Sequence, residues 1–550
     1  MAVKIIFLLS LLCSGVYYEY QSCLLSSVLL LLLWKVVKGN KEFIWKKNYL
    51  SFIFPALPLL YLLSAIWAVD SQMALLGFFK YLPIGIFSVL IMQTLQIRQQ
   101  ILDTLPLAGV SLVILSAAGS LMPSLSEHMV VNGRLAGTFQ YPNTFALFLL
   151  IALLSLLHQK GFDKKCVAQA LVLLAGILAT GSRTVYLLLP ISLLMGCLFT
   201  KEKAIRKMSL GMLAVLVICA AAVLLVTNGG PVARIMDISL SESTLIGRVL
   251  YWKDAFPVIV KNPLGLGYLG YYFTQGSFQT GVYAVTHAHN EFVQLFLDAG
   301  WIAGSGFVAA IFYSIKKVSA SWKRFLIIVM VFHALVDFDL QYMAVYMVLL
   351  SLLPWENGRE WSLQYSKLLP AAALCLAVVL IYSGLGNAAY YFGQPSFAQV
   401  FYPKNTLLQI ERLKQAADLD EMESIANEIT RQNDSVALAW DAKARNAFAQ
   451  GDVLAIMEYK EKAISLSKYE VAEYTDYLDM LFMAIQIYQE AGDIDSAAYC
   501  AETAVNIPLR LEAVREQTSS LGWKVQDKPE LDLPEEYKEV IDLLKDEYRK

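Results

Sequence analysis

The stretch SCLLSSVLLLLLWKVVKGNKEFIWKK, residues 22–47, indicates the structural class of this chain, because it joins a long apolar run to a group of lysines. Its apolar part, 22–37, has close to the length of a membrane-spanning helix. A hydrophobic segment that ends in clustered cations is typical of a span whose end faces the cytoplasm. The lysines at this end are Lys35, Lys38, Lys41, Lys46 and Lys47.

The composition extends this interpretation to most of the chain. Of the 550 residues, 57% are hydrophobic and 16% are charged, whereas soluble proteins carry about 25% charged residues. The mean hydropathy of +0.52 places most of the chain in a bilayer. A net charge of -2 argues against a nucleic-acid partner. The seven cysteines are scattered without metal-ligand spacing and are expected to be small apolar residues.

About thirteen apolar runs follow one another, so the sequence predicts an all-α polytopic transmembrane bundle with 12–13 spans in residues 1–390. The first run lacks a small-x-small cleavage site and is followed at once by another, so it is expected to be retained as a span. The runs centre near 4–17, 22–37, 50–68, 74–92, 101–121, 144–157, 166–180, 184–200, 208–226, 292–315, 324–338, 341–354 and 368–386.

The cations are distributed unequally between alternate connections, which predicts an orientation. One set of connections is rich in lysine and arginine, and the other set holds Arg134, Arg183 and the few cations of the segment 227–291. The N-terminus is therefore expected in the cytoplasm, with the long 227–291 loop and the chain after about residue 387 outside. The cations of the rich set, after those of 22–47, are Arg98, Lys160, Lys164, Lys165, Lys201, Lys203, Arg206, Lys207, Lys316, Lys317, Lys323, Arg324, Arg359 and Lys367.

Residues 391–550 differ in composition from the rest and are expected to form an external soluble helical domain. The stretches GDVLAIMEYKEKAISLSK (451–468) and GDIDSAAYCAETAVNIP (492–508) match each other and resemble the second half of a tetratricopeptide repeat, with Pro508 at the repeat end. Their offset of 41 residues rather than 34 leaves an ordinary helical hairpin bundle as the alternative. A domain of this kind is more plausible as a docking module than as a catalytic one.

Four polar stretches lie at the expected external ends of the spans. An arginine at such a boundary is either a lipid-phosphate anchor or a site residue. The stretch around Arg248 also has the pattern of a helix lying on the membrane surface, and Asn143 suits a helix N-cap. The stretches are GRLAGTFQYPNTFALFLL (133–150), TGSRTVYLLLP (180–190), GRVLYWKDAFPVIVKNPLGLGYLG (247–270) and THAHNEFVQLFLDAG (286–300).

These residue types indicate a particular chemistry at the external face. A guanidinium group offers planar donors that match phosphate oxygens, so several arginines together would suit a diphosphate at the head of a lipid. A histidine can take a proton from an incoming hydroxyl. The chain shows no Gly-rich nucleotide loop and no paired-carboxylate arrangement of a glycosidase. The pattern therefore favours transfer of a group from a lipid diphosphate to an alcohol.

The ordered set GRLAGTFQYPNTFA, GSRT, GR..YW.DA and HAHNEFVQLFLDAG resembles the O-antigen ligase and O-antigen polymerase family of bacterial membrane glycosyltransferases, over roughly residues 60–355. In that family His-Asn is followed after nine residues by Gly-x-x-Gly. Here His289-Asn290 leads to Gly300, but Ala303 replaces the second glycine and Gly304 follows one place later. The departure weakens a helix-packing glycine and leaves the histidine in place.

The resemblance implies a glycosyltransferase-C-like fold and an enzyme in a bacterial plasma membrane that assembles envelope polysaccharide. It implies transfer of a glycan from undecaprenyl diphosphate to a glycan, lipid, wall or protein acceptor, without a metal or other cofactor and with inversion at the anomeric carbon. Carried over by position, the diphosphate-binding candidates are Arg134, Arg183 and Arg248. His289, with Arg248, is the catalytic candidate, and Asn290, His287, Tyr251 and Asp254 are candidates for acceptor or sugar binding.

Two further features lie near the same face. Lys80, in LGFFKYLP, is expected either to extend to the lipid headgroups or to meet the lipid phosphate. The stretch HALVDFDLQ (333–341) has an Asp-x-Asp pattern that could bind a metal with His287, although two carboxylates at a helix exit are more often solvated. Tyr251, Trp252 and Asp254 either line a sugar site or anchor the membrane interface.

Other functions remain open at this point. A protein O-oligosaccharyltransferase has the same motifs as the ligase and the polymerase. A transporter or flippase for lipid-linked glycans also fits a bundle of this size, but transport sites tend to lie at the midplane between repeated halves. The external helical domain predicts an envelope protein partner in addition to the membrane lipids.

Overall fold

The computed structural model describes residues 1–158, 163–227, 243–366, 368–525 and 527–548. Within these ranges the chain is mainly helical, with two pairs of short antiparallel strands. The predicted all-α polytopic fold is confirmed. Lys160 and Lys367, two of the expected cytoplasmic cations, lie outside these ranges, and so does 228–242, the first part of the expected 227–291 loop.

Five helical segments in the described residues are long and apolar enough to cross a membrane. The chain is therefore a multi-pass membrane protein. Asp70 begins one of them as an N-cap, because its carboxylate accepts hydrogen bonds from the backbone N–H groups of Gln72 and Met73. The five are α2 (Glu19–Asn40), α4 (Ser71–Gln93), α5 with α6 (Gln96–Leu102 and Leu105–Ser120), α15 (Glu291–Lys317) and α18 (Leu369–Tyr391).

Shorter apolar helices complete the bundle where the sequence predicted further spans. The first of them has 11 residues, or about 16 Å at 1.5 Å per residue, which is about half the hydrocarbon thickness of a bilayer. The others have between 10 and 17 residues, or about 15–26 Å, and are still shorter than the roughly 30 Å hydrocarbon core. These helices are α1 (Ala2–Leu12), α3 (Leu50–Ser64), α8 (Pro142–Leu157), α10 (Arg183–Phe199) and α17 (Met343–Leu352).

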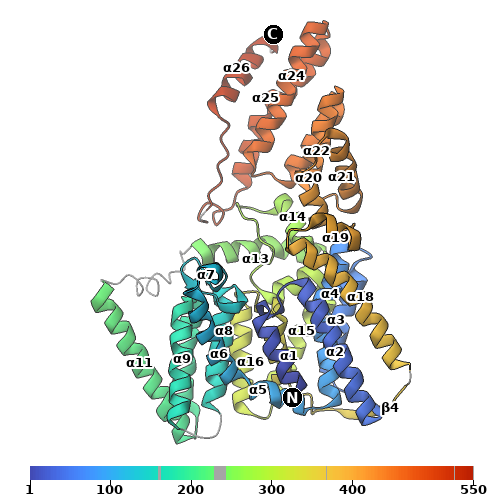
Figure 1. The fold of residues 1–550 in the computed structure, drawn as a ribbon. Helices are drawn as coiled ribbons and strands as arrows, with labels where there is room; N and C mark the ends of the chain where they lie inside the picture. Colours follow the sequence, from blue (N-terminus) through green and yellow to red (C-terminus); the bar gives the residue numbers. More distant parts are fainter. Residues whose placement is uncertain (159–162, 228–242, 367, 526, 549–550) are drawn as a thin grey trace.

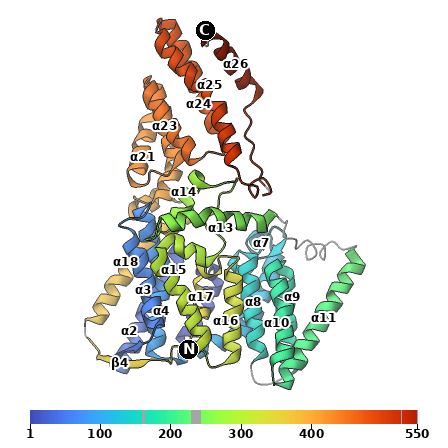
Figure 2. The ribbon, with the colours of Figure 1, turned by 180° about the vertical axis from the view of Figure 1, so that it is seen from behind.

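Three of the remaining helices, Lys164–Thr180, Lys203–Thr227 and Ser321–Ala334, also run alongside the spans (Figures 1 and 2), and the other elements of this half connect the spans or cover their ends. One strand pair joins positions more than 300 residues apart, with Glu42 opposite Gln364 and Lys47 opposite Arg359. The elements are η1 (Ser14–Val16), β1 (Glu42–Lys47), α7 (Pro123–Met129), β2 (Val130–Val131), β3 (Arg134–Leu135), η2 (Gly137–Phe139), α9 (Lys164–Thr180), α11 (Lys203–Thr227), α13 (Ser243–Lys261), α14 (Gly270–Phe278), α16 (Ser321–Ala334), η3 (Asp339–Gln341) and β4 (Arg359–Gln364).

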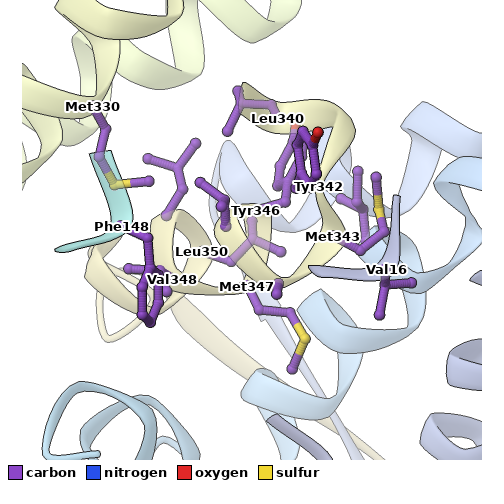
Figure 3. Close-up of a cluster of buried hydrophobic side chains, with 14 of the residues drawn as sticks. Val16, Phe148, Met330, Leu340, Tyr342, Met343, Tyr346, Met347, Val348 and Leu350 are labelled. Carbon is purple, nitrogen blue, oxygen red and sulfur yellow. The ribbon is translucent and has the colours of Figure 1, made fainter. Parts of the chain in front are cut away.

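Helix α17 lies in the middle of the bundle, and all ten of its residues are buried. Its side chains pack against apolar residues from several other elements, among them Val16, Phe148 and Met330 (Figure 3). A helix that is apolar on every side is stable only when neighbours surround it. The core of the membrane half is therefore organised around the segment that directly follows η3.

The two ends of the bundle differ. The N-terminus and β4 lie at one end, whereas α13 lies across the other, with α14 and the C-terminal helices beyond it (Figures 1 and 2). The segment 243–291, expected as an external loop, is thus largely two helices and a well-packed loop that cover this end of the spans. All four polar stretches that the sequence singled out have residues at the α13 end.

The C-terminal half is a series of helical hairpins. In both matching stretches a Gly-Asp pair turns the chain, because Gly451 and Gly492 have φ of +73° and +77°, and Asp452 and Asp493 cap the next helices. The expectation that Pro508 ends the repeat is wrong, since α25 continues through it to Gln517. The helices are α19 (Pro395–Phe401), α20 (Thr406–Lys414), α21 (Leu419–Gln432), α22 (Ala437–Gln450), α23 (Val453–Leu466), α24 (Val471–Ala491), α25 (Ile494–Gln517) and α26 (Glu535–Tyr548).

The two halves are joined by buried polar and apolar contacts. Asp70, the N-cap of α4, also accepts hydrogen bonds from the side chains of Thr406 and Asn433 in the C-terminal half. Apolar residues of α21 such as Ile425 and Ile429 belong to the same buried cluster as the membrane helices. The C-terminal helices are therefore packed onto the α13 end of the bundle.

Candidate active site

The loop before α15 places the two histidines of the THAHNEF stretch. Asn290 is the N-cap of α15, and its side-chain oxygen accepts from Phe292 N at 3.0 Å and Val293 N at 3.1 Å. His289 has φ of +51°, in the left-handed region that a non-glycine residue seldom adopts. Such a backbone persists only where its surroundings hold it, and it is common at functional sites.

Two side chains hold the backbone of the residue between the histidines. Trp252 in α13 donates from its indole nitrogen to the carbonyl of Ala288 at 2.8 Å. Gln294, one turn into α15, accepts from the Ala288 N–H at 2.8 Å. The segment 286–289 is therefore fixed between α13 and α15, and the position of His289 is set by both.

Asp337, in the turn between α16 and η3, is the centre of the site. Its side chain is fully buried, and its Oδ1 accepts from Tyr141 Oη at 2.8 Å. Its Oδ2 accepts from Asn143 Nδ2 at 2.8 Å and from an Arg248 NH2 nitrogen at 3.2 Å. His289 Nδ1 lies 3.4 Å from Oδ1, close enough for an ion pair but without the alignment of a hydrogen bond. One carboxylate thus connects α8, α13 and the histidine loop.

The charge state of Asp337 follows from these neighbours. Burial by itself raises the pKa of a carboxyl group. The Arg248 guanidinium and His289 outweigh this effect and hold the pKa of Asp337 well below its usual range. Asp337 is therefore an anion at physiological pH, and it stabilises the positive charge of Arg248.

Arg134 extends the network toward α9 and α10. Its NH2 nitrogen donates to Asn143 Oδ1 at 2.6 Å, and its Nε donates to the carbonyl of Thr180 at 2.8 Å. Asn143 thus connects Arg134 to Asp337 through its amide, besides opening α8. Arg183, half-buried, is the first residue of α10, three residues after the carbonyl that Arg134 contacts. The network therefore joins Arg134 and Arg248 through Asn143 and Asp337.

Tyr251 and Asp254, expected near a sugar site, have different positions on α13. The Tyr251 ring lies 6.2 Å from the His289 ring, so it belongs to the wall of the site. Asp254 is buried and accepts from the Thr280 N–H at 2.7 Å, from the Thr280 hydroxyl at 2.7 Å and from Tyr283 Oη at 3.0 Å. Asp254 therefore fixes the loop that leads to the histidines.

His287 and Lys80 lie inside the protein next to the network. Lys80 is 1% exposed, so it does not extend to lipid headgroups, and its Nζ lies 4.5 Å from the centre of the Tyr17 ring. Tyr17 Oη is 3.3 Å from His287 Nε2. Burial, together with the charge of Lys80, lowers the pKa of His287 to about 3, so its ring is neutral.

The nearest acids to Lys80 have other partners. The carboxylate of Glu19 accepts from Tyr268 and Tyr391, and the carboxylate of Glu291 accepts from the backbone of η3 and the Gln341 side chain. Within the described parts of the chain, Lys80 forms no ion pair at 4.0 Å or less. A buried ammonium group without an ion-pair partner is costly for stability.

The Asp-x-Asp stretch points inward and is occupied by protein groups. Asp339 Oδ2 lies 2.6 Å from His333 Nδ1, and Asp339 Oδ1 accepts from Thr144 at 2.7 Å. Asp337 has the partners given above, and His287 faces Tyr17 instead. No group of three or more His, Cys, Asp or Glu side chains in the described residues is arranged to hold a metal ion. These contacts give no support to the metal-binding interpretation of 333–341.

Sequence reasoning missed the roles of Asp337, Tyr141 and Asn143. Asp337 stood out only as half of a metal-like pattern, and Asn143 only as a helix cap. The ring of Phe338 lies 4.9 Å from the His289 ring and 5.2 Å from the His287 ring, and no sequence pattern indicated this contact. These contacts join positions up to 196 residues apart, so a single sequence does not show them.

A comparison with known families gives a partial match. The O-antigen ligase family matches residues 168–308, a range that includes Arg183, Arg248 and His289 and leaves Arg134 and Asp337 outside. No curated protein matches the chain. The match supports the O-antigen ligase family, and with it a glycosyltransferase-like enzyme that acts in envelope polysaccharide assembly.

Proposed function

We propose that this protein transfers a glycan from undecaprenyl diphosphate to an acceptor hydroxyl at the external face of the membrane. One observation carries the proposal: a single buried carboxylate, Asp337, lies between Arg248 and His289, and Asn143 connects it to Arg134. Phosphate-binding groups and a proton acceptor thus meet at one end of the bundle, where a lipid headgroup would lie.

In the proposed reaction the acceptor oxygen attacks the anomeric carbon from the face opposite the diphosphate. A new glycosidic C–O bond forms while the bond from the anomeric carbon to the diphosphate oxygen breaks. The acceptor proton passes to His289 Nε2, and undecaprenyl diphosphate leaves with the bonding electrons. Asp337, next to Nδ1, stabilises the imidazolium that forms, as a buried carboxylate does for a catalytic histidine elsewhere.

The arginines stabilise the leaving group in this reaction. Guanidinium groups match phosphate oxygens in geometry and keep their charge at all relevant pH values. Arg248 and Arg134 are positioned by Asp337 and by the Asn143 amide and Thr180 carbonyl, so little reorganisation is needed when charge develops on the diphosphate. Lys80 would add a buried positive charge toward the same phosphates.

The test uses purified protein, an undecaprenyl-diphosphate-linked glycan and an acceptor, with EDTA present. We expect product in EDTA, and we expect His289→Ala to lose at least about a hundredfold in kcat, as removal of a general base does. The control is His128→Ala, an exposed histidine on α7. Normal turnover by His289→Ala would remove the histidine from the mechanism, and loss of wild-type product in EDTA would require a metal.

The orientation of the protein is part of the proposal. The cation-rich connections and the N-terminus share one end of the bundle, and the C-terminal helices lie at the other, which supports a cytoplasmic N-terminus and an external C-terminal domain. In a cysteine-free background, Ala284→Cys should react with an impermeant thiol reagent in intact cells, and Gly39→Cys should not. The reverse labelling pattern would place the site in the cytoplasm.

The acceptor decides between the members of this reaction class. Elongation of the native lipid-linked glycan would identify a polymerase, whereas transfer to a lipid core, the wall or a protein would identify a ligase or a protein glycosylase. The helical hairpins of residues 391–550 support a tetratricopeptide-like domain that binds an envelope protein. Product analysis by mass spectrometry with each acceptor class distinguishes these outcomes.

A further inference from the structure

A segment of the C-terminal half reaches the candidate active site. After α25 ends at Gln517, the chain runs back toward α13 before it rises to α26 (Figures 1 and 2). Residues 518–525 of this connection, called the strut below, contact the loop 279–285. That loop leads directly to the two histidines, so the strut contacts the segment that immediately precedes them in the chain.

The backbones of the strut and the loop touch. Ser519 N–H donates to the carbonyl of Thr280 at 2.9 Å. A Cβ atom placed on Gly522 would lie 2.3 Å from that same carbonyl oxygen and 2.9 Å from Gly281 Cα. Contacts this short leave no space for a side chain, so both glycines are required by the close approach. The strut is therefore packed directly on the loop.

Apolar side chains continue this contact toward the site. Val525 is buried in a cluster with Leu250, Tyr283 and Ala288, and Tyr251 packs against the same cluster. Ala288 precedes His289, and Tyr251 forms the wall beside the His289 ring. The strut thus contacts, through one cluster, both the helix that carries Arg248 and the loop that carries His289.

A second hydrogen-bond group ties the same loop to α13. Asp254 accepts from the N–H and the hydroxyl of Thr280, so Thr280 is held from one side by α13 and from the other by Ser519. His289 needs such support, because its backbone has a positive φ, a strained conformation that is retained only by its surroundings.

We propose that the strut, through Ser519, Gly522 and Val525, positions the histidine loop, so that the C-terminal domain is part of the scaffold of the active site. The inference rests on the proposed function and adds to it three positioning residues outside the membrane half. It differs from a pure docking role, in which changes in the strut would leave the chemistry of the isolated enzyme unchanged.

The first experiment compares Ser519→Pro with Ser519→Ala in the full-length protein. Proline removes the N–H that binds Thr280, whereas alanine keeps it. Thr518 has φ of -67° and ψ of 122°, a backbone that a residue before proline adopts readily. We expect Ser519→Pro to lose roughly tenfold in kcat relative to Ser519→Ala. KM for the lipid-linked donor should change less than kcat, because Arg134 and Arg183 lie on other elements and Arg248 keeps its bond to Asp337.

A second variant keeps the test valid if proline disturbs the end of α25. Val525→Ala removes two methyl groups from the shared cluster, and Val505→Ala removes them from a partly buried position on α25 that belongs to a different cluster. We expect a loss of kcat that exceeds any change in donor KM, and only in Val525→Ala. Equal turnover in Val525→Ala and Val505→Ala, or in Ser519→Pro and Ser519→Ala, would overturn the proposal.

Hydrogen exchange gives a readout that does not depend on the reaction. Ser519→Pro should lose amide protection in residues 279–290 and retain it in α24 and in α15 beyond its first turn. If protection of the loop is unchanged, the strut does not hold it, and the proposal is refuted. If the wild type makes no product while loop protection falls as expected, the proposed reaction fails and the positioning contact stands.

Discussion

Replacing Asp337 by asparagine tests whether the site depends on one buried negative charge. Asparagine has nearly the same shape, keeps one acceptor oxygen and replaces the other with an NH2 group. Asp337 now accepts from Tyr141, Asn143 and Arg248, as well as from the Phe338 N–H at 3.0 Å. At least one of these donors would then face another donor, and Arg248 would lose its counter-charge.

The expected magnitudes follow from these contacts. Removing one partner of a buried charged pair costs about 3–5 kcal/mol of stability, because the other charge stays buried without compensation. Arg248 has a 17% exposed side chain, so the lower end of this range is expected. For catalysis, loss of the carboxylate next to His289 removes its orientation and its stabilised charge, and we expect kcat to fall by about 10²- to 10⁴-fold.

The pH dependence of this loss has a defined sign. The folded-state pKa of Asp337 lies well below its usual range, so its contribution to stability is fully present above about pH 5 and falls only in strong acid. The difference in unfolding free energy between wild type and Asp337→Asn should therefore be constant from about pH 5 to 8. A difference that grows steadily across this range would mean that Asp337 titrates there.

The assay measures single-turnover rates and thermal unfolding in the same detergent. Asp339→Asn is the matched control, because Asp339 is equally buried and binds His333 and Thr144, and it makes no ion pair with Arg248 or His289. Both variants should be destabilised, but only Asp337→Asn should lose the chemical step. If the two variants turn over at the same rate, the network serves the fold and the catalytic argument fails.

Three further changes separate binding, charge and packing. His287→Gln should gain stability relative to wild type as pH falls from about 6.5 toward 4, by up to about 1.4 kcal/mol per pH unit. The pKa of His287 is lowered to about 3, so in this pH range only the unfolded wild type takes up a proton at this histidine. Thermal unfolding at several pH values measures the difference, with exposed His128→Gln as control, and parallel stability curves for wild type and His287→Gln would contradict the prediction. Arg134→Lys should raise donor KM about tenfold, because lysine does not reproduce the hydrogen bonds of Arg134 to Asn143 and Thr180. The control Arg359→Lys, at the opposite end of the bundle, should leave KM unchanged, and equal KM values for the two variants would show that Arg134 does not contact the donor. Lys80→Met should raise the melting temperature, because a buried charge without an ion-pair partner costs stability, and it should weaken donor binding, because it removes a positive charge near the phosphates. A lower melting temperature with unchanged donor affinity would show that Lys80 has only a structural role.

The sequence predicts the elements of this protein better than their contacts. Apolar runs predict the helices because burial or membrane insertion requires them, and Asn290 is a cap because a side-chain oxygen there satisfies free backbone N–H groups. The strands β1 and β4 were not predicted, since each is stable only when paired with a partner some 300 residues away. The prediction that the repeat ends at Pro508 was wrong because this proline lies within α25 rather than at its end.

The candidate site was predicted as a set of residue types but not as a geometry. Arg134, Arg248 and His289 stood out because a cation or a histidine at an external boundary requires a reason. Asp337 did not, because its role depends on a turn that places one carboxylate beside three elements. Local patterns indicate which side chains require a partner, whereas the tertiary fold decides which partner each one receives.

The arrangement of burial around Asp337 favours a catalytic role over a purely structural one. The carboxylate is fully buried, whereas Arg248 is 17% and His289 23% exposed. A buried ion pair adds little to stability when compared with apolar residues of the same size, so stability alone gives no reason for a buried acid with five polar neighbours at this position. An inward anion does something that an apolar core does not: it pairs with the guanidinium of Arg248 and holds the imidazole of His289 beside it, toward the face that a lipid diphosphate would occupy. The strained backbone of His289 adds a cost that is understandable only if the direction of that imidazole matters.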